Sequence, residues 1–198
     1  VVGGRSNVNE LKEGAIEELL GREPVSRDWT GIRAGLASRR VLITGGGGSI
    51  GSELCRQVAR LGVERLAVLE LSEFNLYKVE QELRVEFLVV DPILGDCGDA
   101  ATLERVFSRV KPEAVFHAAA FKHVPLLQHQ VREAVRNNLL ATQTLALAAD
   151  RHGVHNFVLV STDKAVNPSS VMGATKRAAE IYCQSFAQQS KTHFITVR

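Results

Sequence analysis

A run of glycines near residue 45 is the clearest feature of the sequence that could do chemistry. Residues 44–51 read Thr-Gly-Gly-Gly-Gly-Ser-Ile-Gly, follow an apolar stretch and open a helical pattern. Small residues at this spacing let a tight turn approach a pyrophosphate, and the following helix offers free N–H groups and a partial positive charge. This context favours a dinucleotide site over a glycine-rich turn that binds nothing. The expected cofactor contacts are Thr44, Gly45, Gly48, Ser49, Ile50 and Gly51.

Glu70 could complete the same site from the end of the second predicted strand. It follows the glycine run by about 20 residues, where a carboxylate binds the adenosine ribose hydroxyls of NAD. That charge would repel the extra phosphate of NADP, and no arginine lies within residues 71–77 to attract it. The alternative is a solvated glutamate at a strand end. We therefore expect NAD rather than NADP.

Two further segments lie where a dinucleotide would pass. Asp96 and Cys97 follow the third predicted strand, where a carboxylate can accept from the adenine amino group or cap a helix. Asp99 is the better candidate for that cap. Three alanines close the fourth strand, and small side chains there either let the cofactor lie against the backbone or pack a helix tightly. They are Ala118, Ala119 and Ala120.

Polar side chains also gather directly after the fourth and fifth predicted strands. Thr162, Asp163 and Lys164 place a hydroxyl, a carboxylate and an ammonium side by side. Ligands of parallel sheets bind outside such carboxyl ends of strands. The alternative is that Asp163 and Lys164 form a solvated pair in a turn. Lys122 follows the fourth strand at the same edge and could meet a substrate or a phosphate, whereas the adjacent His123 is expected to be structural.

These residues must be positioned by strands and helices that alternate from residue 39 onward. The predicted strands are 40–44, 65–70, a weaker one within 87–94, 114–117, 157–161 and 194–197, and the predicted helices are 50–61, within 73–84, 100–110, 131–151 and 171–189. Such alternation predicts an α/β fold, a doubly wound parallel sheet of the Rossmann type. Pro92 requires an edge strand, which the third strand is in the order 3-2-1-4-5-6. His117 and Asn138 are expected to be packing residues.

The polar residues 1–38 read as an N-terminal linker or extension, with one short helix around residues 10–20. Residues 39–198 form the dinucleotide-binding domain. A net charge of +2 gives no argument for nucleic acid. The three cysteines lack the close pairing of a metal site or a disulfide framework, which favours a reducing cytosol. No apolar run approaches the roughly 20 residues that span a bilayer.

Residues 40–198 resemble the polysaccharide-biosynthesis dehydratases, the extended short-chain dehydrogenases that include UDP-N-acetylglucosamine 4,6-dehydratases. The segments that carry the resemblance are 44–57, 71–77, 117–125, 161–168 and 171–177. The resemblance implies that a UDP-sugar loses water to give a 4-keto-6-deoxy sugar for a capsule or O-antigen. A hydride would leave the sugar C4 for a tightly held NAD, the C5 proton and C6 hydroxyl would leave as water, and the hydride would return to C6.

The resemblance also implies roles for the polar residues. Thr162 would bond the C4 oxygen, Asp163 would protonate the leaving hydroxyl, and Lys164 would help to remove the C5 proton. Short-chain dehydrogenases use Tyr-x-x-x-Lys, but here Met172 stands at the tyrosine position while Lys176 is kept. A thioether cannot exchange a proton, so the base must lie elsewhere. Lys164 is the expected base if desolvation lowers its pKa, because Lys176 should stay charged beside the cofactor.

Two other functions remain open at this point. A nucleotide-sugar 4-epimerase shares the fold and the first oxidation, but would keep a tyrosine at position 172 and would not need the Asp163–Lys164 pair. A non-catalytic NAD-binding sensor or scaffold would explain the lost tyrosine. It would not need the acid–base set that remains.

The resemblance extends to the linker in residues 19–25, which in long relatives joins membrane helices to the catalytic domain. It implies membrane helices before Val1 and a C-terminal sugar-binding lobe after Arg198. We therefore expect a cytoplasmic domain without membrane contact of its own, in a protein anchored in the inner membrane. The 198 residues alone should bind NAD but be weakly active or inactive, and the protein should be a homo-oligomer.

Overall fold

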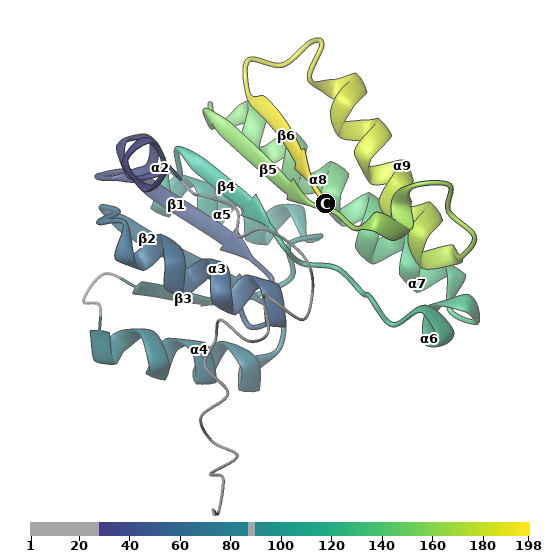
Figure 1. The fold of residues 1–198 in the computed structure, drawn as a ribbon, viewed down its shortest axis with the longest axis horizontal. Coiled ribbons are helices and arrows are strands. Elements are labelled where there is room, and N and C mark those ends of the chain that lie inside the picture. Colours follow the sequence, from purple (N-terminus) through teal and green to yellow (C-terminus); the bar gives the residue numbers. More distant parts are fainter. Residues whose placement is uncertain (1–27, 87–89) are drawn as a thin grey trace, which may run out of the picture.

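The computed structural model describes residues 28–86 and 90–198. Six parallel strands form one sheet in the order β3-β2-β1-β4-β5-β6, as the sequence predicts (Figure 1). The strands are β1 (Arg40–Thr44), β2 (Arg65–Glu70), β3 (Val90–Leu94), β4 (Ala114–His117), β5 (Asn156–Val160) and β6 (His193–Val197). β3 is an edge strand, so the missing N–H of Pro92 costs no central ladder bond.

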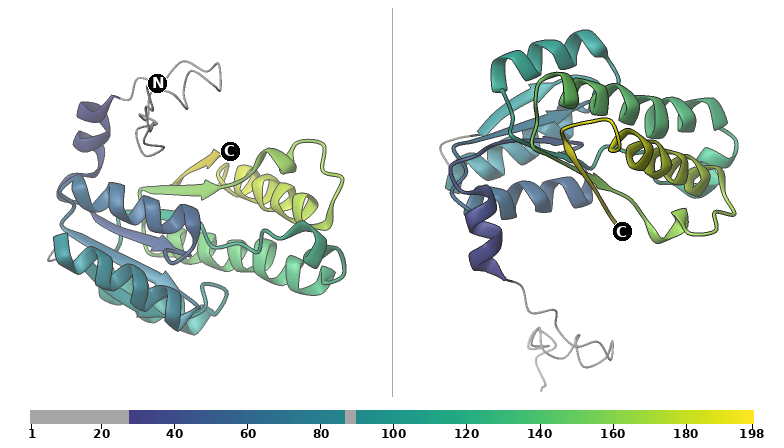
Figure 2. Two further views of the ribbon diagram at one scale, coloured as in Figure 1. Left: turned by 60° about the horizontal axis from the view of Figure 1, so that its bottom comes forward. Right: turned by 90° about the horizontal axis from the view of Figure 1, so that it is seen from above.

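Helices cover both faces of this sheet (Figure 2). They are α2 (Trp29–Leu36), α3 (Ser49–Arg60), α4 (Glu73–Glu86), α5 (Ala100–Val110), α6 (Val124–Gln128), α7 (Val131–Val135), the π-helix η2 (Arg136–Leu140), α8 (Ala141–Arg151), the 3₁₀ turn η3 (Asp163–Ala165) and α9 (Val171–Phe186). The α/β doubly wound prediction is confirmed.

Strand alternation decides which helix each side chain meets. Val41 and Ile43 of β1 are fully buried in a cluster with side chains of α3 and α4, including Val58. Leu42, between them, points to the opposite face and joins a cluster that includes Phe107 of α5. The middle of β1 is therefore apolar on both faces, and the strand fixes the β1–α3 turn at the carboxyl end of the sheet.

Some predicted elements differ from the observed ones. The predicted helix 131–151 is interrupted, because residues 136–140 form a π-helical turn between α7 and α8. α9 ends at Phe186, three residues before the predicted end. α6 and α2 are short, with too few turns for a periodic pattern to reveal them, and α2 lies inside the predicted linker. The helix predicted around residues 10–20 lies outside the described residues.

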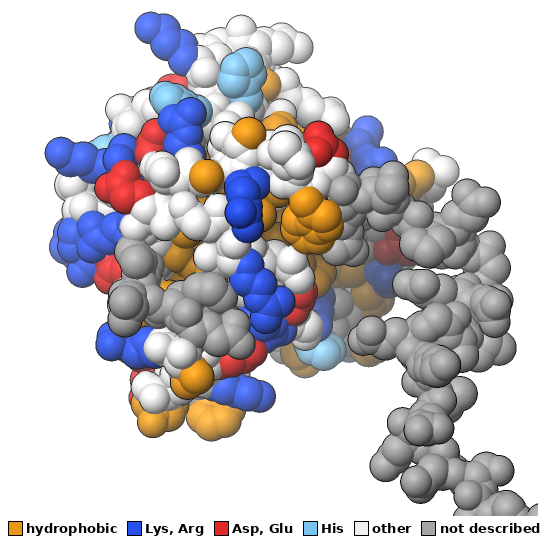
Figure 3. Space-filling view, turned by 60° about the vertical axis from the view of Figure 1, so that its left-hand side comes forward, with side chains coloured by type: hydrophobic (Ala, Val, Ile, Leu, Met, Phe, Trp, Pro, Cys, Tyr) orange, Lys and Arg blue, Asp and Glu red, His pale blue; other side chains and the backbone are white. Residues whose placement is uncertain are grey.

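The surface carries mixed charge. On the face shown in Figure 3, blue and red side chains are interspersed rather than gathered by sign. Several oppositely charged side chains form ion pairs, such as Arg56 with Glu82 at 2.8 Å. Within residues 28–86 and 90–198, no helix is long and apolar enough to cross a membrane.

Candidate active site

The glycine-rich turn brings three elements into close contact. Gly45 has a φ of +70°, and a Cβ there would lie 2.5 Å from the Ala119 Cα atom at the end of β4. A Cβ at Gly51, in the first turn of α3, would lie 2.0 Å from the carbonyl oxygen of Gly45. Gly48 precedes α3, and no side chain caps that end of the helix. Its first N–H groups are therefore available to an anion, as the sequence predicts.

A cavity of about 340 Å³ opens beside this turn at the carboxyl ends of β1, β2 and β4. The residues that were predicted for the cofactor and line it are Gly45, Gly48, Glu70, Asp96, Cys97, Ala118, Ala119 and Ala120. Lining residues that the sequence did not single out include Ser72, Asn75 and Asn137. Eight residues predicted to contact the cofactor, from four separate segments of the chain, therefore line one cavity.

Glu70 links the two turns of this cavity. Its Oε2 accepts from the Gly47 N–H at 2.9 Å, and its Oε1 accepts from the Ser72 N–H at 3.0 Å. Each carboxylate oxygen keeps a further lone pair that can accept from a ribose hydroxyl. Glu70 is therefore held in place by the backbone and not merely solvated.

Asp96 and Asp99 have different tasks. The Asp96 Oδ1 accepts from the Gly98 N–H at 2.7 Å and leaves the carboxylate on the cavity wall. Asp99 is the cap of α5, because its carboxylate accepts from the Thr102 N–H at 2.9 Å. The prediction that Asp99 is the helix cap is confirmed.

Thr44 lies behind the cavity wall rather than on it. It is fully buried, and its hydroxyl lies 2.7 Å from Nδ1 of His117. Nε2 of His117 lies 2.9 Å from the hydroxyl of Thr142, which donates to the carbonyl of Asn138. Thr142 must therefore accept from Nε2–H, and Nδ1 accepts from Thr44. Burial lowers the pKa of His117 to about 3, so the imidazole is neutral. Thr44 and His117 brace β1 against β4.

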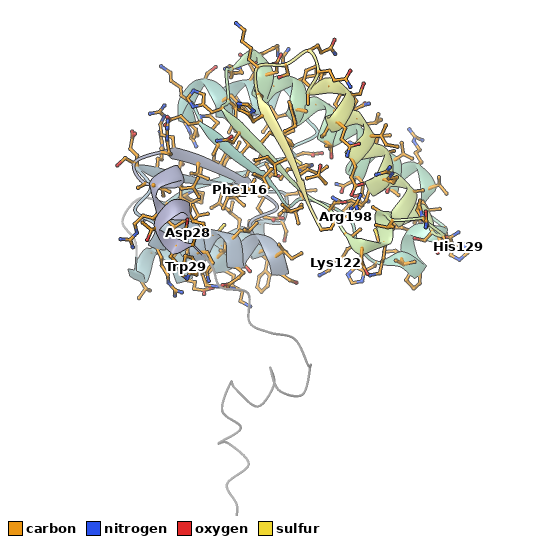
Figure 4. All side chains as sticks on the ribbon, turned by 45° about the horizontal axis from the view of Figure 1, so that its top comes forward. Asp28, Trp29, Phe116, Lys122, His129 and Arg198 are labelled. Atoms are coloured by element: carbon orange, nitrogen blue, oxygen red, sulfur yellow. The ribbon has the colours of Figure 1, made fainter. Side chains whose placement is uncertain are left out.

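A second cavity, of about 630 Å³, lies where β5 and α9 face the first turn of α3. Its walls carry eight further predicted positions, namely Ser49, Ile50, Gly51, Lys122, Thr162, Lys164, Met172 and Lys176. Phe121, His123, Leu126, Gln130 and Glu133 also line it. The Lys122 ammonium donates to the Ser49 hydroxyl at 3.2 Å and so links two walls of the cavity. In Figure 4, Lys122 lies toward the sheet and His129 at the far tip of the same segment.

Lys176 is the buried cation of this cavity. Its side chain is 4% exposed, and its ammonium donates to the Val160 carbonyl oxygen at 2.7 Å. Burial lowers the pKa of Lys176 to about 8, and the nearby negative charge of Glu180 opposes that shift. This shift favours a larger neutral fraction than an exposed lysine has, and the charge of Lys176 beside a bound cofactor stays a prediction.

Thr162, Asp163 and Lys164, the polar trio after β5, are more exposed than Lys176. The Thr162 hydroxyl donates to Asp163 Oδ1 at 2.9 Å, and the Lys164 ammonium approaches the same oxygen at 3.4 Å. These two contacts lower the pKa of Asp163. The side chains of Asp163 and Lys164 are 86% and 55% exposed. Thr162 and Lys164 line the cavity, whereas Asp163 does not. The desolvation that the sequence reasoning required of Lys164 is absent.

Met172 is both a wall and a packing residue. It is 4% exposed and packs with Leu127 and Ala134 beneath α6 and α7. It lies one helical turn before Lys176 on α9, so both side chains share a face. α9 starts close to η3, since a Cβ at Gly173 would lie 2.3 Å from the Lys164 carbonyl oxygen. The polar trio after β5 therefore lies at the same site as Met172 and Lys176 of α9.

Asn138 braces the loop that joins the two cavities. Its Oδ1 accepts from the Phe121 N–H at 2.8 Å, and its Nδ2 donates to the Phe121 carbonyl at 3.0 Å. Nδ2 also donates to the Thr175 hydroxyl of α9 at 3.1 Å. Asn138 is a packing residue, as the sequence predicts, and its contacts are structural.

Comparison with known proteins agrees with this arrangement. The sequence profile of the polysaccharide biosynthesis protein family matches residues 41–198. The chain belongs to this family. The matched range includes every residue named above on the walls of the two cavities. The resemblance predicted from the sequence is confirmed.

Three similar proteins illustrate how far the similarity extends. Capsular polysaccharide biosynthesis protein CapD of Staphylococcus aureus is 45% identical over 100% of this chain and 34% of its own length. The UDP-N-acetylglucosamine 4,6-dehydratase (inverting) of Campylobacter jejuni is 29% identical over 81% of this chain and 48% of its own length. The structure of Thermus thermophilus UDP-glucose 4-epimerase with NAD has a TM-score of 0.68 and 27% identity, over 80% of this chain and 54% of the epimerase. This chain thus spans about a third of CapD.

Proposed function

We propose that this chain is the NAD-binding domain of a nucleotide-sugar 4,6-dehydratase that acts on a UDP-N-acetylglucosamine-like sugar in surface polysaccharide biosynthesis. The observation that carries the proposal is the second cavity. Three lysines and a threonine line it, the Asp163 carboxylate lies at its edge, and a buried methionine stands where an alcohol-oxidising tyrosine is expected. Such a set serves proton transfers on a sugar and is unnecessary for cofactor binding alone.

The first cavity fits NAD. The turn at Gly45 has no room for a side chain, the start of α3 is uncapped, and Glu70 presents a carboxylate on the wall. These groups would hold the pyrophosphate and the adenosine ribose, and Asp96 would accept from the adenine amino group. When bound, the cofactor would accept a hydride from the sugar and later return it. The Glu70 charge should exclude the extra phosphate of NADP.

The residues of the second cavity divide the proton transfers between them. Thr162 would donate to the C4 oxygen of the sugar. Lys176 in its neutral form is a better acceptor for the alcohol proton than Lys164, because its amine is buried and burial lowers its pKa. Lys164 would take the C5 proton and return a proton to C5 when the hydride comes back to C6, and desolvation of its amine by the bound sugar would favour that role. Asp163 must gain a proton before it can donate to the leaving hydroxyl, so the sugar must also displace Lys164 from its carboxylate.

The epimerase alternative is weaker but specific. An epimerase shares the oxidation and would need neither Asp163 nor Lys164. The missing phenol at Met172 argues against it, because that reaction would be expected to keep the tyrosine. The two enzymes predict different products, so one experiment separates them.

That experiment uses the natural full-length chain that carries this sequence. It would be incubated with NAD and a panel of UDP- and dTDP-sugars, and the products would be identified by mass and by trapping of the 4-ketone. A dehydratase yields a product lighter by one water. A product of unchanged mass but altered sugar configuration would indicate the epimerase. Tight NAD binding without any product from the panel would favour the sensor or scaffold.

The cellular setting is proposed on separate grounds. Cys55, Cys97 and Cys183 are free, buried thiols, which suits a reducing cytoplasm. We propose a cytoplasmic domain of a protein anchored in the inner membrane, which assembles as a homo-oligomer. Cell fractionation and light scattering of the natural full-length chain would test both statements.

A further inference from the structure

Glu180 is a fully buried carboxylate behind the second cavity. Its Oε1 accepts from the Ser161 hydroxyl at 2.6 Å and from Arg198 Nε at 3.0 Å. Its Oε2 accepts from Arg177 Nη1 at 2.9 Å and from Arg198 Nη2 at 2.8 Å. These partners lower the pKa of Glu180 to about 2. Burying a charge is costly unless such partners compensate for it, so apolar packing alone does not account for this residue.

Glu180 and Lys176 both form hydrogen bonds with residues at the end of β5. They lie four residues apart on α9 and so share one face of the helix. Lys176 donates to the carbonyl of Val160, and Glu180 accepts from the hydroxyl of Ser161, the next residue. Thr162 follows directly. The position of its hydroxyl in the cavity is thus set by two consecutive contacts to α9.

We propose that Glu180 is a positioning residue of this site, which fixes the end of β5 through Ser161 and supplies the buried negative charge that stabilises the ammonium of Lys176. This inference rests on the proposed function for its catalytic meaning. Glu180 itself lines neither of the two cavities. Its influence must therefore pass through Ser161 and Lys176.

Among the titratable groups around Lys176, Glu180 is the one whose negative charge stabilises the ammonium. His117 of β4 faces Lys176 and is neutral, and burial raises the pKa of the Cys183 thiol on α9 to about 12. The other titratable groups on the cavity wall are Lys122, His123, Glu133 and Lys164, and the Asp163 carboxylate lies at its edge. Arg177 and Arg198 contact Glu180 from behind. Without its carboxylate, both guanidinium groups would lose this ion-pair partner.

The test measures the protonation of Lys176 directly in the natural full-length chain. The rate of its acetylation by acetic anhydride, followed by mass spectrometry across pH, gives a midpoint that reports the neutral amine. Glu180→Gln should move this midpoint to lower pH by more than about half a unit. Arg177→Gln should move it to higher pH, because Glu180 then has one fewer cationic partner. Glu82→Gln, an exposed charge change on α4, is the matched control and should leave it unchanged.

Two further measurements keep the proposal decidable. If Glu180→Gln does not fold, as judged by its thermal transition, Arg177→Gln alone decides. Ser161→Ala removes the hydroxyl contact without changing charge, so it should lower kcat while leaving the acetylation midpoint in place. A folded Glu180→Gln variant with an unmoved midpoint, or an unmoved midpoint in Arg177→Gln, would overturn the proposal. Acetylation can be measured in a protein that turns over no substrate. A shifted midpoint without dehydratase activity would therefore reject the proposed function but leave the proposal for Glu180 standing.

Discussion

The ammonium of Lys176 lies 2.7 Å from the carbonyl oxygen of Val160, the last residue of β5. That contact uses one of its three protons and leaves the amine on the wall of the second cavity, one turn after Met172. Lys164 approaches the same cavity from an exposed turn. The two lysines therefore differ in solvation, and their variants should differ in effect.

Exchanging each lysine for methionine should separate their roles. Lys176→Met should weaken NAD binding and lower the rate together, because its amine serves the cofactor side and the base. Lys164→Met should lower the rate by about 100-fold or more while NAD affinity stays within about twofold. Calorimetric NAD titration and turnover of the natural full-length chain would measure both. Equal losses of NAD affinity in the two variants would contradict this division.

Gly45→Ala should abolish NAD binding and lower the melting temperature. The added Cβ would collide with the backbone of Ala119, in addition to the strain of a positive φ. Gly62→Ala is the matched control, since Gly62 has a φ of +78° but open space around it. That variant should cost only about 1 kcal/mol of unfolding free energy and keep NAD affinity. Similar losses in both variants would show that strain, not the collision, matters.

Glu70→Gln should narrow the preference for NAD over NADP. The amide keeps an acceptor for a backbone N–H but removes the charge that repels a 2′-phosphate. Titration of both cofactors at equal ionic strength gives the ratio, with Glu73→Gln at the start of α4 as a charge control. Wild-type protein that binds NADP more tightly than NAD would remove Glu70 from this role.

Met172→Leu should be nearly silent in stability and rate, because it conserves volume beside Leu127 and Ala134. Met172→Ala should lower the unfolding free energy by about 2–5 kcal/mol, since it leaves a cavity in a buried cluster. Chemical denaturation and kcat would be compared, and a large loss of kcat in the folded leucine variant would give the thioether a chemical role.

Acid should unfold the domain partly through His117. Its pKa is about 3 in the fold against 6.5 for the unfolded side chain, so the unfolded state binds the extra proton between these values. Stability from this group is complete above about pH 6.5 and is lost as pH falls toward 3, by roughly 2 kcal/mol at pH 5. His117→Asn should flatten the pH dependence of the unfolding free energy, whereas His129→Gln, at an exposed position, should not.

The strand order and the first cavity were predictable because they follow from local rules. Glycine spacing after an apolar strand and a carboxylate at the end of β2 both report backbone geometry. The solvation of Lys164 and Lys176 was not predictable, because it depends on how α9 packs against β5. The same holds for Thr44, whose hydroxyl turns to His117, and for Asp163, whose exposure is set by η3. Glu180 gave no sequence signal beyond its place in a helix.

The π-helical turn also makes the domain sensitive to a kind of mutation other than substitution. The N–H of Ala141 donates to the carbonyl of Arg136, five residues back, so the helix holds one residue more than an α-turn would. An in-frame loss of one codon there would restore α-geometry and move the remaining residues of the turn around the helix axis by about 100°. Asn138 would swing away from Phe121, and the loop between the cavities would lose its brace. Alleles with single-codon deletions in residues 136–140 should therefore behave as nulls, even where substitutions at the exposed positions are tolerated.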